Sequence, residues 1–130
     1  MKKILLLLIM GVSLLTFSQN AIFHSKYMEM CKFNYEKDDY VIDEEMWIDV
    51  ELTAYEEYCV LLVEGEEKKM WWEFNIDESD DDFYIYYTEN HTDKIVFDDS
   101  QEEIYIFFEY NSRKEEYEEL IILSKITLEK

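Results

Sequence analysis

The stretch Asp81–Tyr110, DDFYIYYTENHTDKIVFDDSQEEIYIFFEY, decides the fold of this chain. It predicts three short strands, Phe83–Tyr87, Lys94–Phe97 and Glu103–Tyr110, separated by two polar turns. In the last of them large apolar side chains recur at every second position, which is the period of a pleated sheet. β-branched and aromatic residues, which favour such a surface, dominate all three segments. The stretch therefore predicts a β-meander on which the rest of the chain packs.

Further strands are expected on both sides of the meander. The segments are Ala21–Tyr35 (one strand, or two with a bend near Glu29), 40–42, Trp47–Thr53, Tyr58–Val63, Met70–Ile76 and a last one after Tyr110. In the last segment the shared parity of Leu120, Ile122, Ile126 and Leu128 favours a strand, although its glutamates also suit a helix. We expect an all-β, antiparallel domain of about seven to nine strands. A small barrel is preferred over a sandwich because closure removes exposed edges.

The first 18 residues have the layout of a secretory signal peptide. Lys2 and Lys3 precede an apolar run from Ile4 to Leu15, and the segment 16–19 that follows supplies a small residue, Ser18, at a cleavage site. The run is shorter than the about 20 residues that a membrane span needs, so we expect no transmembrane segment in the mature protein. Residues 1–18 are expected to be removed, and residues 19–130 to form a single β-domain in the periplasm or outside the cell.

Acidic residues outnumber basic ones by 32 to 12, which gives a net charge of −20. Removal of the two N-terminal lysines leaves 10 basic against 32 acidic residues, a net charge of −22. Nucleic acids and anionic membranes are bound through an excess of Lys and Arg, so both are excluded as partners. Basic proteins are attracted instead. The alternative is that the carboxylates only keep an exported sheet protein soluble.

Cys31 and Cys59 are the only cysteines. Export places them in an oxidising compartment, where a disulfide between them would close a loop worth roughly 3 kcal/mol. The alternative is two buried thiols that behave as small apolar side chains. No histidine cluster accompanies them, so the spacing does not predict a zinc site.

The acidic loop 77–82 offers a candidate calcium site. Asp77, Ser79 and Asp81 match the first three oxygen positions of a calcium-binding loop, but the glycine and the closing glutamate of that pattern are missing. Weak calcium binding is therefore the only cofactor that the sequence suggests, against the simpler reading of a solvated turn. His91 with a nearby carboxylate could act as a general base, yet no nucleophile motif accompanies it, and we expect no enzyme activity.

Aromatic residues expected on one face of the meander, joined by Trp71 if Trp72 faces the core, give a candidate binding surface. Its members are Trp71, Tyr84, Tyr86, Tyr105 and Phe107. One parity of these strands must face the core, and the other is either covered by further sheet or exposed as a Tyr-rich patch. An exposed patch ringed by acids suits a basic protein partner, because Tyr and Trp concentrate binding energy. It could also stack against sugar rings.

The opening MKKILLLLIMGVSLLTFSQ is similar to export signals of Bacteroidota. With its acidic, aromatic and strand-rich remainder, the chain resembles the small exported β-sheet proteins of unknown function from that group. The resemblance implies a compartment and an architecture and supplies no functional residue. We expect a non-catalytic binding module for a protein or surface component, of the kind that an inhibitor or immunity protein uses against a basic enzyme. A calcium-binding module is the alternative, and a hydrolase ranks last.

Overall fold

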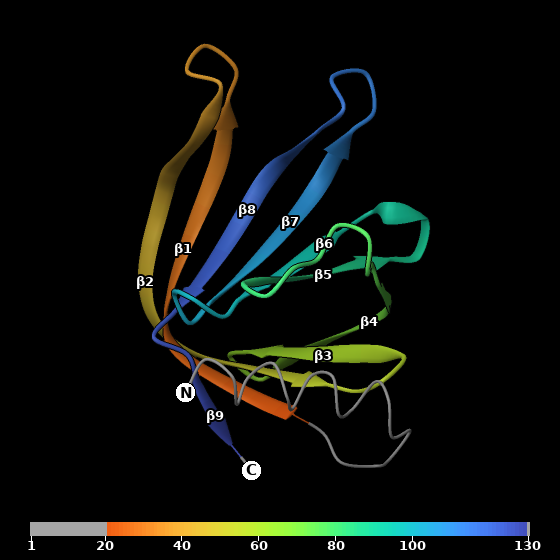
Figure 1. The fold of residues 1–130 in the computed structure, drawn as a ribbon. Coiled ribbons are helices and arrows are strands. Elements are labelled where there is room, and N and C mark those ends of the chain that lie inside the picture. Colours follow the sequence, from red (N-terminus) through yellow and green to blue (C-terminus); the bar gives the residue numbers. More distant parts are fainter. Residues whose placement is uncertain (1–20, 130) are drawn as a thin grey trace.

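The computed structural model describes residues 21–129. Within this range the chain forms nine strands and one short 3₁₀ helix, η1 (Figure 1). Their bounds are β1 Ala21–Asn34, β2 Asp39–Ala54, β3 Tyr58–Val63, β4 Glu66–Phe74, β5 Phe83–Thr88, η1 Glu89–His91, β6 Lys94–Asp98, β7 Glu103–Asn111, β8 Glu116–Ser124 and β9 Thr127–Glu129. The expected signal peptide lies outside the described residues. No helix of the described part is long and apolar enough to cross a membrane.

The strands close into an antiparallel barrel. Strands β2 to β8 neighbour one another in chain order, and β1 pairs with both β2 and β8, which completes the ring. Strand β9 continues along β1 where β8 ends, with Ser124 opposite Tyr27 and Thr127 opposite His24. The expected all-β barrel is confirmed, and the three strands of the meander agree with the sequence prediction to within one residue at each end.

Three segments refine the sequence prediction. Strand β2 runs through 16 residues where the sequence indicated two strands, because it pairs with β1 along its whole length while its acidic side chains remain in solvent. Strand β4 begins at Glu66 rather than Met70 for the same reason, as its charged first residues pair with β3. The last segment forms β8 and β9, so the helical alternative is wrong. Strand β1 is continuous, with register shifts on either side of Met28.

Aromatic side chains fill the inside of the barrel. Phe97 is fully buried, and its ring lies 5.2 Å from that of Phe23, 5.9 Å from Trp72 and 5.6 Å from Tyr86. Aliphatic side chains from the other strands complete the core; the fully buried ones include Leu52, Ile95, Ile104 and Leu123. Burial of this apolar area is the main source of stability.

A second set of aromatic side chains packs outside this core. It comprises Phe33, Tyr35, Tyr40, Phe107, Tyr110 and Tyr117, none of which belongs to the core cluster; we call it the outer aromatic cluster. Neighbouring rings lie 4.9 to 6.1 Å apart. The residues come from the β1–β2 and β7–β8 hairpins, whose tips extend beyond the barrel at the top of Figure 1. Contact between Tyr40 and Phe107 therefore joins the two hairpins.

A candidate binding cavity between β4 and η1

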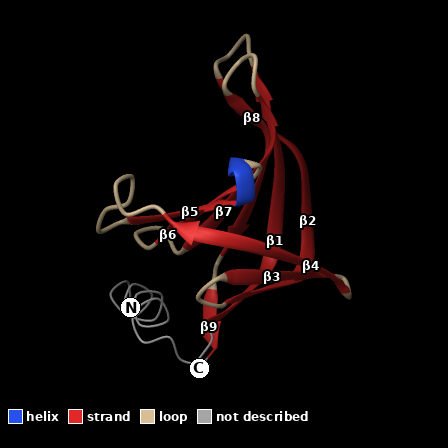
Figure 2. Ribbon diagram, turned by 90° about the vertical axis from the view of Figure 1, so that its right-hand side faces the viewer, coloured by secondary structure: helices blue, strands red, loops and turns tan. Residues whose placement is uncertain are grey.

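A cavity of about 580 Å³ lies where the β4–β5 ladder ends. The two strands pair over only three residues, and the last pair is Trp72 with Thr88. Past that pair the chain leaves β5 and turns through η1, the one helical turn that Figure 2 draws among the described strands. Side chains line an open hollow at this point, where the paired strands end. Its lining is Trp71, Trp72, Glu73, Tyr87, Thr88, Glu89 and His91.

Aromatic rings form two walls of the cavity. Trp71 is 50% exposed because it alternates along β4 with the buried Met70 and Trp72. On the other side, the ring of His91 stacks on Tyr87 with centroids 4.3 Å apart and planes 17° apart. The Tyr87 and His91 rings therefore cover one face of each other, and the Lys69 ammonium lies 4.5 Å from the centre of the Trp71 ring.

Carboxylates supply the charge of the cavity. Glu73 lies directly opposite Tyr87 in the ladder, and Glu89 belongs to η1; both side chains are exposed. Tyr87 donates its hydroxyl hydrogen to Glu78, 2.8 Å away, which fixes the position of its ring. Burial, followed by this hydrogen bond, raises the pKa of Tyr87 above its usual range, so the phenol keeps its proton. None of the lining residues is a lysine or arginine.

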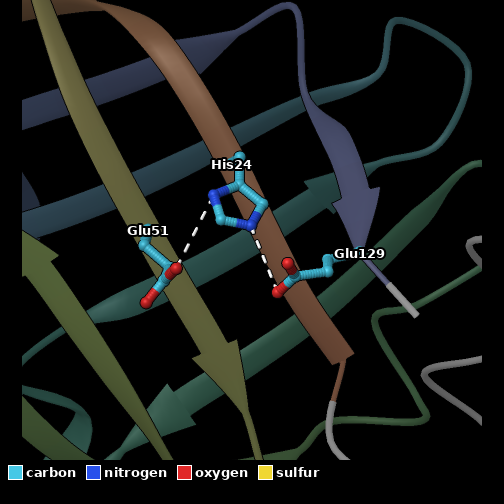
Figure 3. Close-up of side chains that lie close together, drawn as sticks. All are labelled: His24, Glu51 and Glu129. Carbon is cyan, nitrogen blue, oxygen red and sulfur yellow. Dashed lines mark ion pairs between the residues drawn. The ribbon is translucent and has the colours of Figure 1, made fainter.

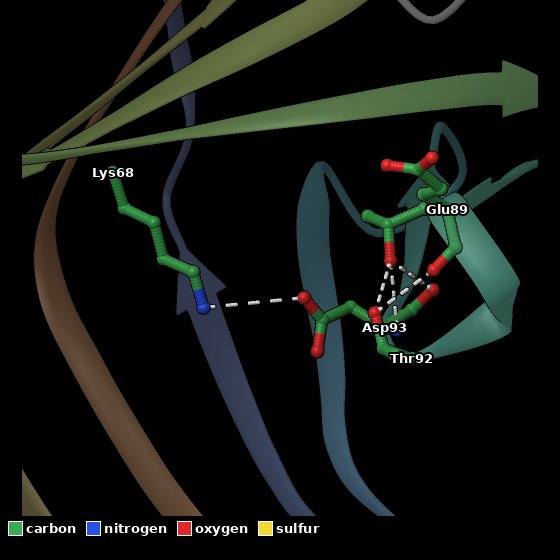
Figure 4. A network of polar contacts seen from close by, with 5 residues as sticks. Lys68, Glu89, Thr92 and Asp93 are labelled. Atoms are coloured by element: carbon green, nitrogen blue, oxygen red, sulfur yellow. Dashed lines mark hydrogen bonds and ion pairs between the residues drawn. The ribbon is translucent and has the colours of Figure 1, made fainter.

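Short polar contacts hold the turn that carries η1 (Figure 4). The Asp93 N–H donates to Thr88 Oγ1 at 2.8 Å, and the Thr92 hydroxyl donates to the Glu89 carbonyl at 3.2 Å. The Lys68 ammonium reaches from β4 to within 4.0 Å of the Asp93 carboxylate. These contacts position Glu89 and His91 relative to β4.

One residue of the outer aromatic cluster, Tyr117, bonds to the backbone of the cavity residue His91. His91 has a left-handed backbone with a φ of +57°, a conformation that costs a residue with a side chain roughly 1–2 kcal/mol. Tyr117 donates its hydroxyl hydrogen to the His91 carbonyl at 2.8 Å. Burial raises the pKa of Tyr117 to about 12, so the hydrogen stays available. This contact and the stacking on Tyr87 stabilise the strained residue.

The structure separates the residues of the expected binding surface. Trp71 lines the cavity, but Tyr84 and Tyr86 are each only 3% exposed and belong to the core. Their grouping with Tyr105 and Phe107 is therefore wrong. The reason is register: Tyr84 lies opposite Phe97, which lies opposite Ile104, so these three share the inner face.

The two remaining residues of that set lie outside the barrel but away from the cavity. Phe107 belongs to the outer aromatic cluster. Tyr105 donates its hydroxyl hydrogen to Glu103 at 2.6 Å, with Asp98 at 3.2 Å. Neither lines the hollow, so a single continuous Tyr-rich face does not form.

The acidic loop is closed by its own hydrogen bonds. Ser79 donates its hydroxyl hydrogen to the Asn75 carbonyl at 2.6 Å and accepts one from the Ile85 N–H at 2.9 Å. Asp77 and Asp81 are exposed, and within the described residues no three carboxylates of this loop converge on a common point. Calcium binding here stays a prediction that this geometry does not favour.

The expected disulfide is not formed. Cys31 and Cys59 are both free and buried. Cys59 is fully enclosed in the core cluster, whereas Cys31 lies outside that cluster, opposite Leu120 of β8. Burial raises the pKa of Cys59 to about 12, so its thiol stays protonated and unreactive.

Sequence reasoning missed most of the cavity. Glu73 and Tyr87 are neighbours only through the register of β4 and β5, and the long connection between these strands does not fix that register. His91 was expected in a turn, with a nearby carboxylate as a possible general base, and its stacking on Tyr87 was not expected. Comparisons of the chain with protein-family models, with curated proteins and with solved structures found no match.

Proposed function

We propose that this chain is an exported, non-catalytic binding module that takes a cationic group of a basic protein into the cavity between β4 and η1. The composition of the lining carries the proposal. Trp71, Tyr87 and His91 supply aromatic rings to the lining, while Glu73 and Glu89 supply carboxylates. A lysine or arginine side chain gains from both, through cation–π attraction and through charge-assisted hydrogen bonds.

The surface rings of this protein already attract cations of its own chain. The Lys69 ammonium lies 4.2 Å from the centre of the Tyr58 ring and 4.5 Å from that of Trp71. The Lys114 ammonium lies 3.8 Å from the Tyr35 ring. A partner's cation would make the same kind of contact with the cavity walls, and the net charge of −20 would speed its approach.

The proposal is tested with a hexa-arginine peptide, a hexalysine peptide and an uncharged oligosaccharide as probes. Binding is measured by titration calorimetry at about 0.05 M and about 0.5 M salt, because exposed charges are screened at the higher concentration. We expect the arginine peptide to bind more tightly than the lysine peptide, since the guanidinium group stacks on rings and pairs with carboxylates in two-point contacts. Oligosaccharide binding in place of peptide binding would contradict the proposal.

Matched variants locate the binding. Trp71→Ala is expected to weaken binding of the arginine peptide about 2- to 30-fold, the range that a cation–π contact provides. Trp47→Ala is the control, because Trp47 is 73% exposed and lines a different hollow with Tyr27 and Lys125. Equal losses in the two variants would show a diffuse attraction to the negative charge and would contradict binding in the cavity.

A further inference from the structure

Three potential metal ligands converge on the outer surface of the barrel, away from the cavity (Figure 3). His24 Nδ1 lies 3.6 Å from Glu51 Oε1, and His24 Nε2 lies 3.5 Å from Glu129 Oε2. The side chains come from three strands, β1, β2 and β9, that lie side by side. His24 is directly opposite Glu51 in the ladder, and Glu129 is opposite Ile22, one diagonal step away.

The spacing of these atoms is close to that of ligands around one ion. One ligand atom from each residue lies within 4.8 Å of the other two. Ligands bonded to a tetrahedral ion at about 2.1 Å lie about 3.4 Å from one another. The two glutamates now contact different ring nitrogens, so at least one of them must rotate toward the nitrogen that binds the ion. All three side chains are at least one-third exposed, so they are free to make that rotation.

We propose that His24, Glu51 and Glu129 bind a first-row divalent cation of the zinc type, with water in the fourth position. An imidazole nitrogen with two carboxylates suits zinc and its neighbours, whereas calcium and magnesium prefer oxygen ligands alone. A hollow of about 530 Å³ beside the site is lined by His24 and Glu51 together with two further acids, Asp49 and Glu64. Lys26 also lines it, so the local charge remains negative.

The site has a structural consequence for the C-terminal strand. Strand β9 is only three residues long and pairs with β1 alone. An ion held by Glu129, His24 and Glu51 would tie β9 across β1 to β2. Metal binding therefore stabilises β9 in addition to occupying a surface site.

The experiment uses the chain with zinc chloride as the probe, in a buffer that contains a large excess of calcium. Calcium competes for the surface carboxylates, but it prefers oxygen ligands and does not displace zinc from a site with an imidazole nitrogen. We expect one zinc ion per chain, with affinity reduced at least tenfold in His24→Ala. His91→Ala is the matched control, because it removes the other of the two histidines and leaves the three ligands intact. Glu129→Gln, at an exposed strand end, is expected to weaken zinc binding as well.

A second readout follows from the position of β9. Hydrogen exchange of the β9 amides is expected to slow when zinc is added to the natural chain and to stay unchanged in His24→Ala. Melting in a chelator checks that every variant is folded before zinc is added. Equal zinc affinity in His24→Ala and the natural chain, or no zinc binding in the presence of calcium, would overturn the proposal. The peptide assay of the cavity is independent of either result.

Discussion

The inner core and the outer aromatic cluster use the same residue type in different ways. Tyr86, inside the barrel, packs its ring against Trp72 at 4.2 Å and against Phe74 at 5.2 Å. Tyr40, outside, packs against Phe107 and also donates its hydroxyl hydrogen to the Tyr117 carbonyl at 2.6 Å. The core is stabilised chiefly by buried apolar area, although Tyr84 within it also donates its hydroxyl hydrogen to the Asp81 carbonyl at 3.0 Å. In the outer layer a larger share of the contacts are hydrogen bonds from phenols to nearby acceptors.

This difference explains how a chain with 32 acids and 12 bases pairs its carboxylates. Tyr35 donates to Glu118 at 2.9 Å, as Tyr87 does to Glu78 and Tyr105 to Glu103. In each case burial, followed by contact with the acid, raises the pKa of the tyrosine. Phenol hydrogens thus pair with these three carboxylates, as lysines pair with Asp43 and Asp93.

Replacing one ring of the inner core and one ring of the outer aromatic cluster by alanine should separate their contributions to stability. Phe97→Ala is expected to lower the free energy of unfolding by about 3–5 kcal/mol, because it empties the centre of a core that cannot collapse fully. Phe107→Ala should cost less, about 1–3 kcal/mol, because Phe107 is only half-buried. Urea titration measures both values. An equal loss in the two variants would mean that the outer cluster is a second core.

Removal of a single hydroxyl tests the outer hydrogen bonds without changing the packing. Tyr40→Phe should lower the free energy of unfolding by about 0.5–1.5 kcal/mol, because it leaves the Tyr117 carbonyl without this donor. Tyr110→Phe is the control: Tyr110 is 46% exposed, and its change should stay within about 0.5 kcal/mol. Urea titrations of both variants would contradict this account if Tyr40→Phe were as neutral as the control.

The smallest expected effect comes from a carboxylate that faces other carboxylates. Glu29 lies opposite Glu45 across β1 and β2; burial, followed by repulsion from Glu45 and Glu103, raises the pKa of Glu29. At a pH between the unfolded pKa, about 4.3 for glutamate, and the raised folded pKa, Glu29 is protonated in the folded state and ionised in the unfolded state. Stability contributed by this proton is present below the unfolded pKa and is lost as pH rises through the raised one.

Glu29→Gln should therefore increase the free energy of unfolding at neutral pH by about 0.2–1 kcal/mol, the range for a like-charged cross-strand pair. It should also reduce the gain in stability that the natural chain shows on acidification from neutral pH to about 5. Denaturant titrations at both pH values measure the two effects. If the variant kept the pH dependence of the natural chain, repulsion at Glu29 would not be its cause.

Prediction from the sequence succeeded where one strand alone carries the signal. The alternation in Glu103–Tyr110 and the run Tyr58–Val63 fixed strands that the structure reproduces. It failed where two strands must be compared, as with Tyr84 and Tyr105, which were expected on the same face but lie on opposite faces. The turns between strands determine whether the odd-numbered or the even-numbered residues of the next strand face inward. The alternation within a strand does not predict the geometry of those turns.

The sequence by itself determined the all-β class, the negative charge and the aromatic richness, because these follow from local alternation and composition. Only the tertiary structure decided which tyrosines are buried, that the two cysteines stay apart, and that Trp71 meets His91 across a hollow. It also decided that His24, Glu51 and Glu129 converge although up to 105 positions separate them in the chain. Those contacts depend on ladder register and barrel closure, which are properties of the whole sheet rather than of any one segment.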